Sequence, residues 1–153
     1  MSWIQYELNI SGNNSVERLF NAVIDGTLTA LIGCEDVQII NGDGTMEYGN
    51  AEIRFETNKN IKAALNSYLT QECTDTAYAI CFYLDERANE CGYFAVNLEA
   101  MEYNKPNEHF EVSYPLFDSV DEFREEFEKG LNIIANEDLL IFISRYMTLE
   151  GVI

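Results

Sequence analysis

The chain has few residues whose type and spacing could support catalysis. His109 is the only histidine, and it precedes a short stretch of alternating apolar residues. A histidine acts as a catalytic base only beside a nucleophile or a proton donor, and sequence spacing selects no serine or cysteine as its partner. We therefore expect His109 to be a surface residue at the edge of a strand.

Loops with oxygen-bearing side chains are the next candidates, because such groups bind cations. Neither DGTME at 43–47 nor DERANE at 85–90 follows the alternating pattern of an EF-hand, with its required glycine and terminal glutamate. NGDGT at 41–45 lacks the GxGxxG and GK[ST] patterns of phosphate-binding loops, and its glycines predict a hairpin turn at 41–44. The sequence therefore predicts no catalytic residue, no metal site and no cofactor.

The most unusual segment is DSVDEFREEFEK at 118–129, in which six of twelve residues are carboxylates. Acid–base catalysis needs two carboxyl groups whose environments separate their pKa values, and the adjacent Glu125 and Glu126 point in different directions on a helix. A surface that binds a positively charged partner is the better interpretation. The candidate partner-binding residues are Glu108, Glu111, Asp118, Asp121, Glu122, Glu125, Glu126 and Glu128.

These carboxylates carry a local cost in stability. Like charges four residues apart on a helix, such as Asp121 and Glu125, repel each other by a few tenths of a kcal/mol per pair. Negative charge is favourable near the start of a helix, but Glu125, Glu126 and Glu128 stand toward its end, where the helix dipole opposes them. This unfavourable placement is the reason to expect a function for the charge.

The whole chain is strongly acidic. Nine Lys and Arg residues face 27 Asp and Glu residues, which gives a net charge of −18. Proteins bind nucleic acids and anionic membranes through basic side chains. The negative electrostatic field of this chain therefore repels both, whereas it attracts basic proteins. Solubility alone is the other explanation of the charge, and composition does not decide between the two.

Cysteine spacing and the N-terminal residues predict a reduced, cytoplasmic protein. The four cysteines, at 34, 73, 81 and 91, form neither a CxxC pair nor a zinc-ligand pattern. The N-terminus lacks the basic start and the long apolar core of a signal peptide. The longest strongly apolar run, LLIFI at 139–143, is too short to span a bilayer. We therefore expect free thiols and a cytoplasmic location.

Hydrophobic periodicity predicts alternating strands and helices along the chain. The expected strands lie at 4–10, 37–40, 51–56, 77–84, 93–100 and 110–114. Because the run at 77–84 is apolar on both faces, it predicts a central strand, and the charged loop DERANECG joins it to the next strand.

Capping residues and apolar stripes of helical period predict the helices. The caps are expected at Asn14, Asn58, Ser119 and Asn136, and a short helical turn is expected at 27–33. The first stripe comprises Val16, Leu19, Phe20, Val23 and Ile24. The last comprises Leu139, Phe142, Ile143, Tyr146 and Met147. Gly130 stands where a glycine would end the helix that follows Ser119.

The order of these elements predicts an α+β fold. A β-α-β-β-α-β order is the split β-α-β arrangement of ferredoxin-like folds, with both helices on one face of an antiparallel sheet. Extra strands and two C-terminal helices follow this arrangement. We expect a single domain over 1–153, with a core at 1–100 and a strand plus helical addition at 101–153.

Three segments resemble one known family. They are SWIQYELNISG at 2–12, AEIRFETNKNIKAALNSYL at 51–69 and AICFYLDERANECGYFAV at 79–96. Together they are similar to the Api92/YubB-like ferredoxin-like proteins of phages and plasmids, over roughly residues 1–100. The resemblance implies a ferredoxin-like fold and an origin in a mobile genetic element, and it implies no active site.

Two functions follow as hypotheses. The first is a non-enzymatic inhibitor that presents its carboxylates to a basic, nucleic-acid-handling protein, in the manner of a nucleic-acid mimic from a phage or plasmid. The second is a structural or adaptor domain that binds through an apolar patch or a sheet edge. Its expected anchors are Trp3, Tyr103, Tyr146 and Met147. Salt should weaken the first kind of complex and leave the second unchanged.

Overall fold

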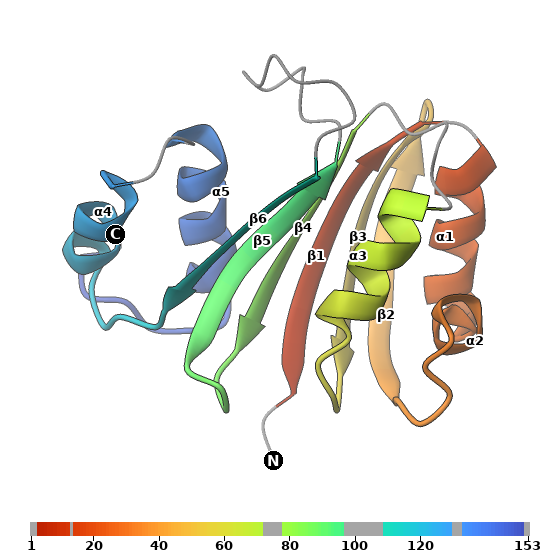
Figure 1. Cartoon of the computed structure of the whole chain (residues 1–153), viewed down its shortest axis with the longest axis horizontal. Coiled ribbons are helices and arrows are strands. Elements are labelled where there is room, and N and C mark those ends of the chain that lie inside the picture. The colour runs from red at the N-terminus through yellow and green to blue at the C-terminus, as the bar shows by residue number, and fades with distance from the viewer. Residues whose placement is uncertain (1–2, 13, 72–77, 97–108, 130–132, 152–153) are drawn as a thin grey trace.

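A six-stranded antiparallel sheet lies at the centre of the protein (Figure 1). The computed structural model describes residues 3–12, 14–71, 78–96, 109–129 and 133–151. The strands are β1 (Ile4–Ser11), β2 (Ile39–Glu47), β3 (Asn50–Thr57), β4 (Tyr78–Asp85), β5 (Glu90–Val96) and β6 (His109–Pro115), and the helices are α1 (Asn14–Asp25), α2 (Leu28–Ile32), α3 (Lys62–Gln71), α4 (Val120–Phe127) and α5 (Ile133–Ser144). The strand order is β2-β3-β1-β4-β5-β6, so the fold is α+β, as predicted.

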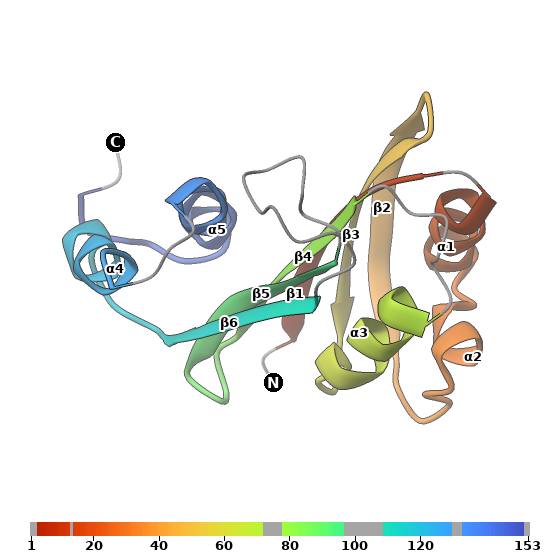
Figure 2. The same cartoon turned by 45° about the horizontal axis from the view of Figure 1, so that its top comes forward.

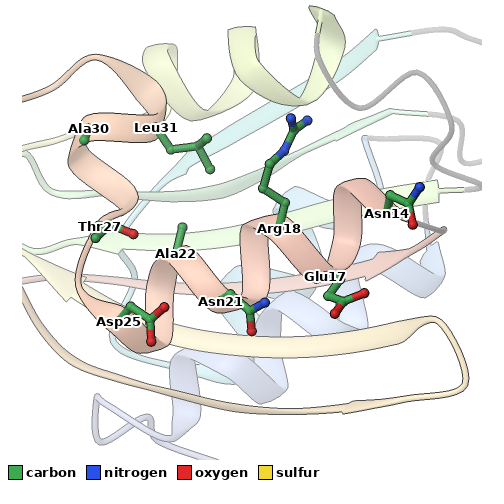
Figure 3. Close-up of a pocket in the computed structure, with 9 residues that line it drawn as sticks. All are labelled: Asn14, Glu17, Arg18, Asn21, Ala22, Asp25, Thr27, Ala30 and Leu31. Carbon is green, nitrogen blue, oxygen red and sulfur yellow. The ribbon is translucent and has the colours of Figure 1, made fainter.

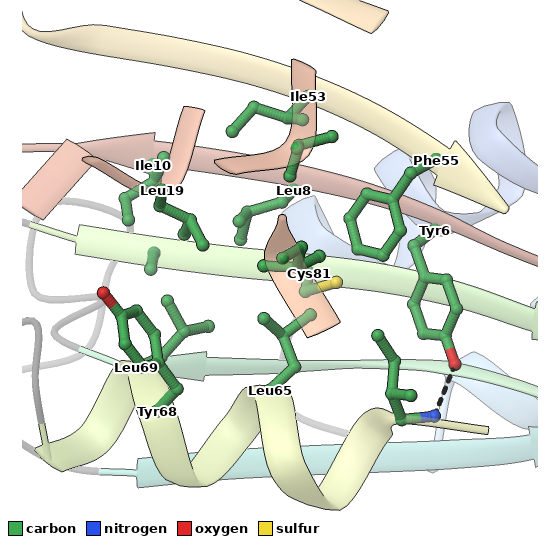
Figure 4. Packing of buried hydrophobic residues seen from close by; sticks show 14 of the residues in the cluster. Tyr6, Leu8, Ile10, Leu19, Ile53, Phe55, Leu65, Tyr68, Leu69 and Cys81 are labelled. Atoms are coloured by element: carbon green, nitrogen blue, oxygen red, sulfur yellow. Dashed lines mark hydrogen bonds between the residues drawn. The ribbon is translucent and has the colours of Figure 1, made fainter. Parts of the chain in front are cut away.

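One face of the sheet packs against the N-terminal helices. Tyr6, Leu8 and Ile10 of β1 are buried on this face with apolar residues of α1 and α3 (Figure 4). The Tyr6 hydroxyl accepts a hydrogen bond of 3.0 Å from the backbone N–H of Ile61, just before α3. The Tyr6 ring stacks on Phe55 with 5.0 Å between the centroids. Period-two alternation in β1 thus places one side of the strand in an apolar core.

The other face packs against α4 and α5 over β4, β5 and β6 (Figure 2). Strand β4 is buried on both sides, because Cys81 and Tyr83 face the N-terminal helices whereas Phe82 faces α5. The ring centroid of Phe142 in α5 lies 6.0 Å from that of Phe82. The prediction of a central strand at 77–84 is therefore confirmed.

The turn between β2 and β3 lies at Tyr48 and Gly49, so the prediction of a hairpin turn at 41–44 is wrong. The φ angles of Tyr48 and Gly49 are 54° and 79°, and two positive values are typical of a type I′ turn. Residues 41–44 belong to β2 instead. A Cβ atom at Gly44 would lie 2.2 Å from the backbone oxygen of Glu52, so this glycine permits a close approach of two strands.

Asn58 was predicted to cap α3, but it is Asn60, two residues before the first residue of this helix, that bonds to the helix start. The side-chain oxygen of Asn60 accepts a hydrogen bond of 2.8 Å from the backbone N–H of Lys62. The side-chain oxygen of Asn58 accepts one of 2.7 Å from the backbone N–H of Gln38. Both asparagines are thus used by local backbone groups, and sequence spacing did not distinguish which one begins the helix.

Asn136 lies inside α5 rather than at its start, which is Ile133. Its side chain is buried, and its carbonyl oxygen accepts hydrogen bonds from the hydroxyl groups of Tyr93 at 2.9 Å and Tyr114 at 3.0 Å. Two hydroxyl donors from distant residues thus satisfy the carbonyl oxygen of an asparagine inside a helix. The predicted cap is therefore wrong, because β5 and β6 supply its partners.

Several element ends also differ from the predictions. Strand β5 begins at Glu90, three residues before the expected start at 93, because residues 86–89 form a tight turn. Tyr146 and Met147 follow α5 and pack against the core beside it, whereas Ile24 on α1 is 46% exposed. Gly130 lies outside the described residues. Among the helices within the described ranges, none has both the length and the apolar character that a bilayer crossing requires.

Candidate functional site

Helix α4 positions the predicted carboxylates. The hydroxyl of Ser119 accepts a hydrogen bond of 3.2 Å from the backbone N–H of Glu122, so Ser119 is the N-cap, as predicted. Val120, Phe123 and Phe127 are buried against the core beneath the helix. Because apolar residues recur at this spacing, the acidic residues between them are directed to solvent.

Five carboxylates form the exposed side of this helix and its flanks, and we refer to them together as the acidic ridge. The acidic ridge comprises Asp118, Asp121, Glu122, Glu125 and Glu128, all of which are exposed. None of the five forms an ion pair with any residue in the described ranges. Residues three or four positions apart on a helix have Cβ atoms about 5–6 Å apart, so the acidic ridge is a closely spaced row of negative charge.

Two basic residues near the acidic ridge neutralise other carboxylates. The ammonium group of Lys129 lies 3.1 Å from Glu126, whose side chain is 36% exposed. The guanidinium group of Arg124 lies 3.4 Å from Glu137 on α5. Glu126 was predicted to belong with the other partner-binding residues, but its charge is compensated by Lys129, which follows α4.

Two further predicted residues do not join the acidic ridge. Glu111 on β6 lies beside Phe94 in the sheet register and faces α3, on the side opposite to α4. Its carboxylate is 2.9 Å from the ammonium group of Lys62, which also lies over the Tyr83 ring. The sheet thus separates Glu111 from α4. Glu108 lies outside the described residues.

The predicted apolar anchors are only partly accessible. Trp3, Tyr146 and Met147 are half-buried, and the last two pack against the core beside α5. Tyr103 and the side chain of His109 lie outside the described part of the chain. Among the described residues the most exposed large apolar side chains are Tyr48 and Ile141, neither of which sequence reasoning selected.

A hollow of about 660 Å³ lies on the surface of α1 and α2 (Figure 3). Arg18 extends away from the carboxylates of Glu17 and Asp25, and the lining includes Leu31 (Figure 3). Catalysis needs acid and base groups that converge on one point. The charged groups of this hollow diverge, so its geometry offers no such point.

A buried charge cluster around Glu7 was missed by sequence reasoning. Glu7 on β1 is 6% exposed, and its carboxylate pairs with Arg54 on β3 at 3.6 Å and with Arg145 just after α5. Burial and the charge of Glu7 raise the pKa of the nearby Tyr146 hydroxyl. Glu7 alternates with apolar residues along β1, and only folding brings Arg145 over it. The cluster ties the end of α5 to the sheet.

The cysteine environments disfavour thiol chemistry within the described residues. Cys81 and Cys91 are fully buried on opposite faces of the sheet. Burial raises the pKa of Cys91 from 9.0 to about 12, and it raises the pKa of Cys81 as well. Thiolates are the reactive form of cysteine, so both thiols are unreactive in the folded protein. In the described ranges, no group of three or more His, Cys, Asp and Glu side chains is arranged to hold a metal ion.

Thiol labelling checks this arrangement. In a Cys73→Ser background, we expect a disulfide reagent at pH 8 to modify Cys34, which is half-buried, and to leave Cys81 and Cys91 unmodified. A rise from 9.0 to about 12 lowers the thiolate fraction of Cys91 roughly a thousandfold. Both buried thiols should react fully once the chain is unfolded in denaturant. Rapid labelling of Cys91 in the folded protein would contradict its placement.

The same pKa shift sets an alkaline limit to stability. The folded state holds the Cys91 thiol neutral, whereas the unfolded state ionises near the ordinary pKa of 9.0. The contribution of this thiol to stability is therefore fully retained below about pH 9 and is lost as the pH rises toward 12. Thermal unfolding followed across this range should show the decline, and a Cys91→Ala variant should show a shallower one.

Comparisons of the chain with protein-family models, with curated proteins and with solved structures found no match. Its function is therefore inferred from geometry and charge.

Proposed function

We propose that this protein is a non-enzymatic inhibitor that uses its acidic ridge to bind a basic, nucleic-acid-handling protein. The observation that supports this most directly is the row of five exposed carboxylates without ion pairs to described residues. A basic groove that normally holds phosphates would recognise such a row by charge. A phage or plasmid anti-defence protein, or an immunity protein that neutralises a nuclease, would act in this way.

The position of the charges on α4 favours this proposal over solubility alone. Asp121 and Glu122 lie in the first turn, where the helix dipole stabilises negative charge. Glu125 and Glu128 lie in the last turn and at the C-cap, where the dipole destabilises it. A solubilising charge could stand anywhere on the surface. Glu125 and Glu128 are both at the unfavourable end of one short helix. A cationic partner that neutralises these two carboxylates would explain why they are placed there.

The net charge of −18 adds a long-range contribution. Electrostatic attraction raises the rate at which a basic protein meets an acidic one, and the effect weakens as salt is added. The acidic ridge would then provide the specific contact after the encounter. The proposed partner is a protein, since a field of this sign opposes direct contact with nucleic acid.

We also propose that β1 to β4, with α1 and α3, form a ferredoxin-like split β-α-β core. The order β2-β3-β1-β4 with antiparallel pairing, and the position of both helices on one face, support this assignment. Strands β5 and β6 extend the sheet on the β4 side, and α4 is attached to this extension. In this proposal the core is the scaffold that holds the acidic ridge away from the N-terminal helices.

A pull-down with two charge variants tests the proposal. The first variant carries Glu122→Gln, Glu125→Gln and Glu128→Gln, and the second carries three neutralised carboxylates elsewhere. The control substitutions are Glu17→Gln, Glu35→Gln and Glu86→Gln, which all lie at exposed positions. Both variants have the same net charge, so they differ only in where the charge is removed.

Wild type and the control variant should capture the same basic protein from a lysate of the source organism, and stepwise NaCl should release it. The acidic-ridge variant should not retain it. Circular dichroism should show that all three proteins are folded, because each substitution is at the surface. Equal capture by the two variants would contradict the proposal.

A further inference from the structure

A second feature lies next to the acidic ridge, between α4 and α5. The two helices pack side by side (Figure 2), and a groove of about 380 Å³ runs along their outer surfaces. Its apolar lining includes Val120 on α4 and Leu140 and Ile141 on α5. The C-terminal segment closes one end, where the backbone N–H of Val120 donates to the oxygen of Glu150 at 2.9 Å.

Ile141 is the exposed apolar side chain of this groove, whereas Val120 and Leu140 are buried. It lies within LLIFI at 139–143, where Phe142 and Ile143 face the sheet and are fully buried. Ile141 points the other way and is 56% exposed. Ile141 shares the outer side of α5 with the polar residues Glu137 and Ser144, so an exposed isoleucine there is a candidate contact residue.

The two charged residues in the lining of the groove pair with each other, and carboxylates of the acidic ridge lie beside them. Arg124 and Glu137 form an ion pair of 3.4 Å that bridges the two helices at the rim. Asp121 and Glu128 lie three residues before and four residues after Arg124, so they flank it on the same side of α4. An apolar floor thus adjoins the acidic ridge, and a partner that fits both must be apolar on one side and basic on the other.

We propose that the groove receives the apolar face of a basic amphipathic helix, which belongs to the partner of the acidic ridge. Helix α4 has eight residues and is therefore about 12 Å long, which matches about two turns of a docked helix. Apolar side chains at helical spacing pack on the exposed Ile141, above the buried Leu140, and Lys or Arg residues beside them lie against the acidic ridge. This inference rests on the proposed function and specifies which element of the partner makes the contact.

Two synthetic peptides test the inference. The first is a Leu/Lys peptide with leucines on one helical face, and the second has the same composition with the leucines dispersed around the helix. Their binding to the full chain is measured by fluorescence anisotropy at low and high salt. The protein variants are Ile141→Gln and the matched control Ile24→Gln, because Ile24 is a 46% exposed isoleucine on α1. The acidic-ridge variant described above is included.

The amphipathic peptide should bind wild type and the Ile24→Gln variant alike and should bind the Ile141→Gln variant about tenfold more weakly. The dispersed peptide should bind more weakly and should not respond to Ile141→Gln. Added salt should weaken both complexes, and the acidic-ridge variant should lose affinity for both peptides at low salt.

Each failure has its own meaning. If Ile141→Gln leaves the amphipathic complex unchanged while the acidic-ridge variant weakens it, the groove inference is overturned and the proposed function stands. If the acidic-ridge variant binds both peptides as tightly as wild type, the charge contact is absent and both proposals fail. If the amphipathic peptide does not bind wild type, the groove does not receive such a helix.

Discussion

Replacing Phe142 with alanine is expected to lower the free energy of unfolding by about 3–5 kcal/mol. Phe142 is fully buried at the centre of the core beneath α5, and its ring lies 6.0 Å from Phe82 and 5.2 Å from Tyr146. The substitution removes ring contacts on both the sheet side and the helix side. It also leaves a cavity that the rigid sheet can fill only in part.

The adjacent residue provides the control for this prediction. Ile141→Ala removes a side chain that is 56% exposed, so its cost should stay below about 1 kcal/mol. Urea unfolding of both variants measures the difference, and an unchanged m-value shows that both unfold from the same state. Similar losses from the two substitutions would mean that α5 does not present Phe142 to the sheet.

Gly92→Ala is expected to lower the free energy of unfolding by about 3 kcal/mol. A Cβ atom at Gly92 would lie 2.1 Å from the backbone oxygen of Val112 and 2.9 Å from the Cα of Ser113. Both neighbours are backbone atoms of the paired strand, so no side chain can rotate away. Strand β6 must shift instead, and the hydrogen bonds between β5 and β6 weaken.

Gly33→Ala is the control for this prediction, because it tests the cost of an unfavourable backbone conformation without a steric clash. Gly33 has a φ of 78°, but a Cβ atom there would meet nothing within 4 Å. Its replacement should therefore cost only about 1 kcal/mol, the penalty of a left-handed alanine. Hydrogen exchange should show lost protection in β6 for Gly92→Ala alone. A small effect of Gly92→Ala with protected β6 amides would contradict the pairing of these strands.

The parts of the fold that were predicted correctly are those in which the sequence pattern and burial coincide. Tyr6, Leu8 and Ile10 alternate with polar residues, and the sheet buries them on one face. The apolar run at 77–84 has no polar side, and it forms β4 inside the sheet. The hairpin turn was predicted at the wrong place because Gly44 permits the close approach of β2 and β3 and does not form a turn. Local turn preferences do not distinguish these two uses of a glycine.

The sequence predicted those parts of the candidate site that depend on residue spacing within a single helix. The apolar stripe formed by Val120, Phe123 and Phe127 determines which side of α4 faces solvent. The periodicity of this stripe therefore predicted the exposed acidic side. Glu111 was wrongly grouped with the carboxylates of α4. The face of the sheet on which it lies depends on the pairing of β6 with β5, which the sequence does not reveal. The pairing of Glu7 with Arg145 depends on folding across 138 positions, which no local pattern encodes.

The affinity of the captured partner for the two charge variants, measured across salt concentrations, tests the central claim most directly. If the acidic ridge is the contact, the variant with Glu122→Gln, Glu125→Gln and Glu128→Gln should bind at least about tenfold more weakly than the equally charged control at low salt. This difference should shrink as salt screens the contact. If both variants bind with the affinity of wild type at every salt concentration, the acidic ridge does not contact the partner.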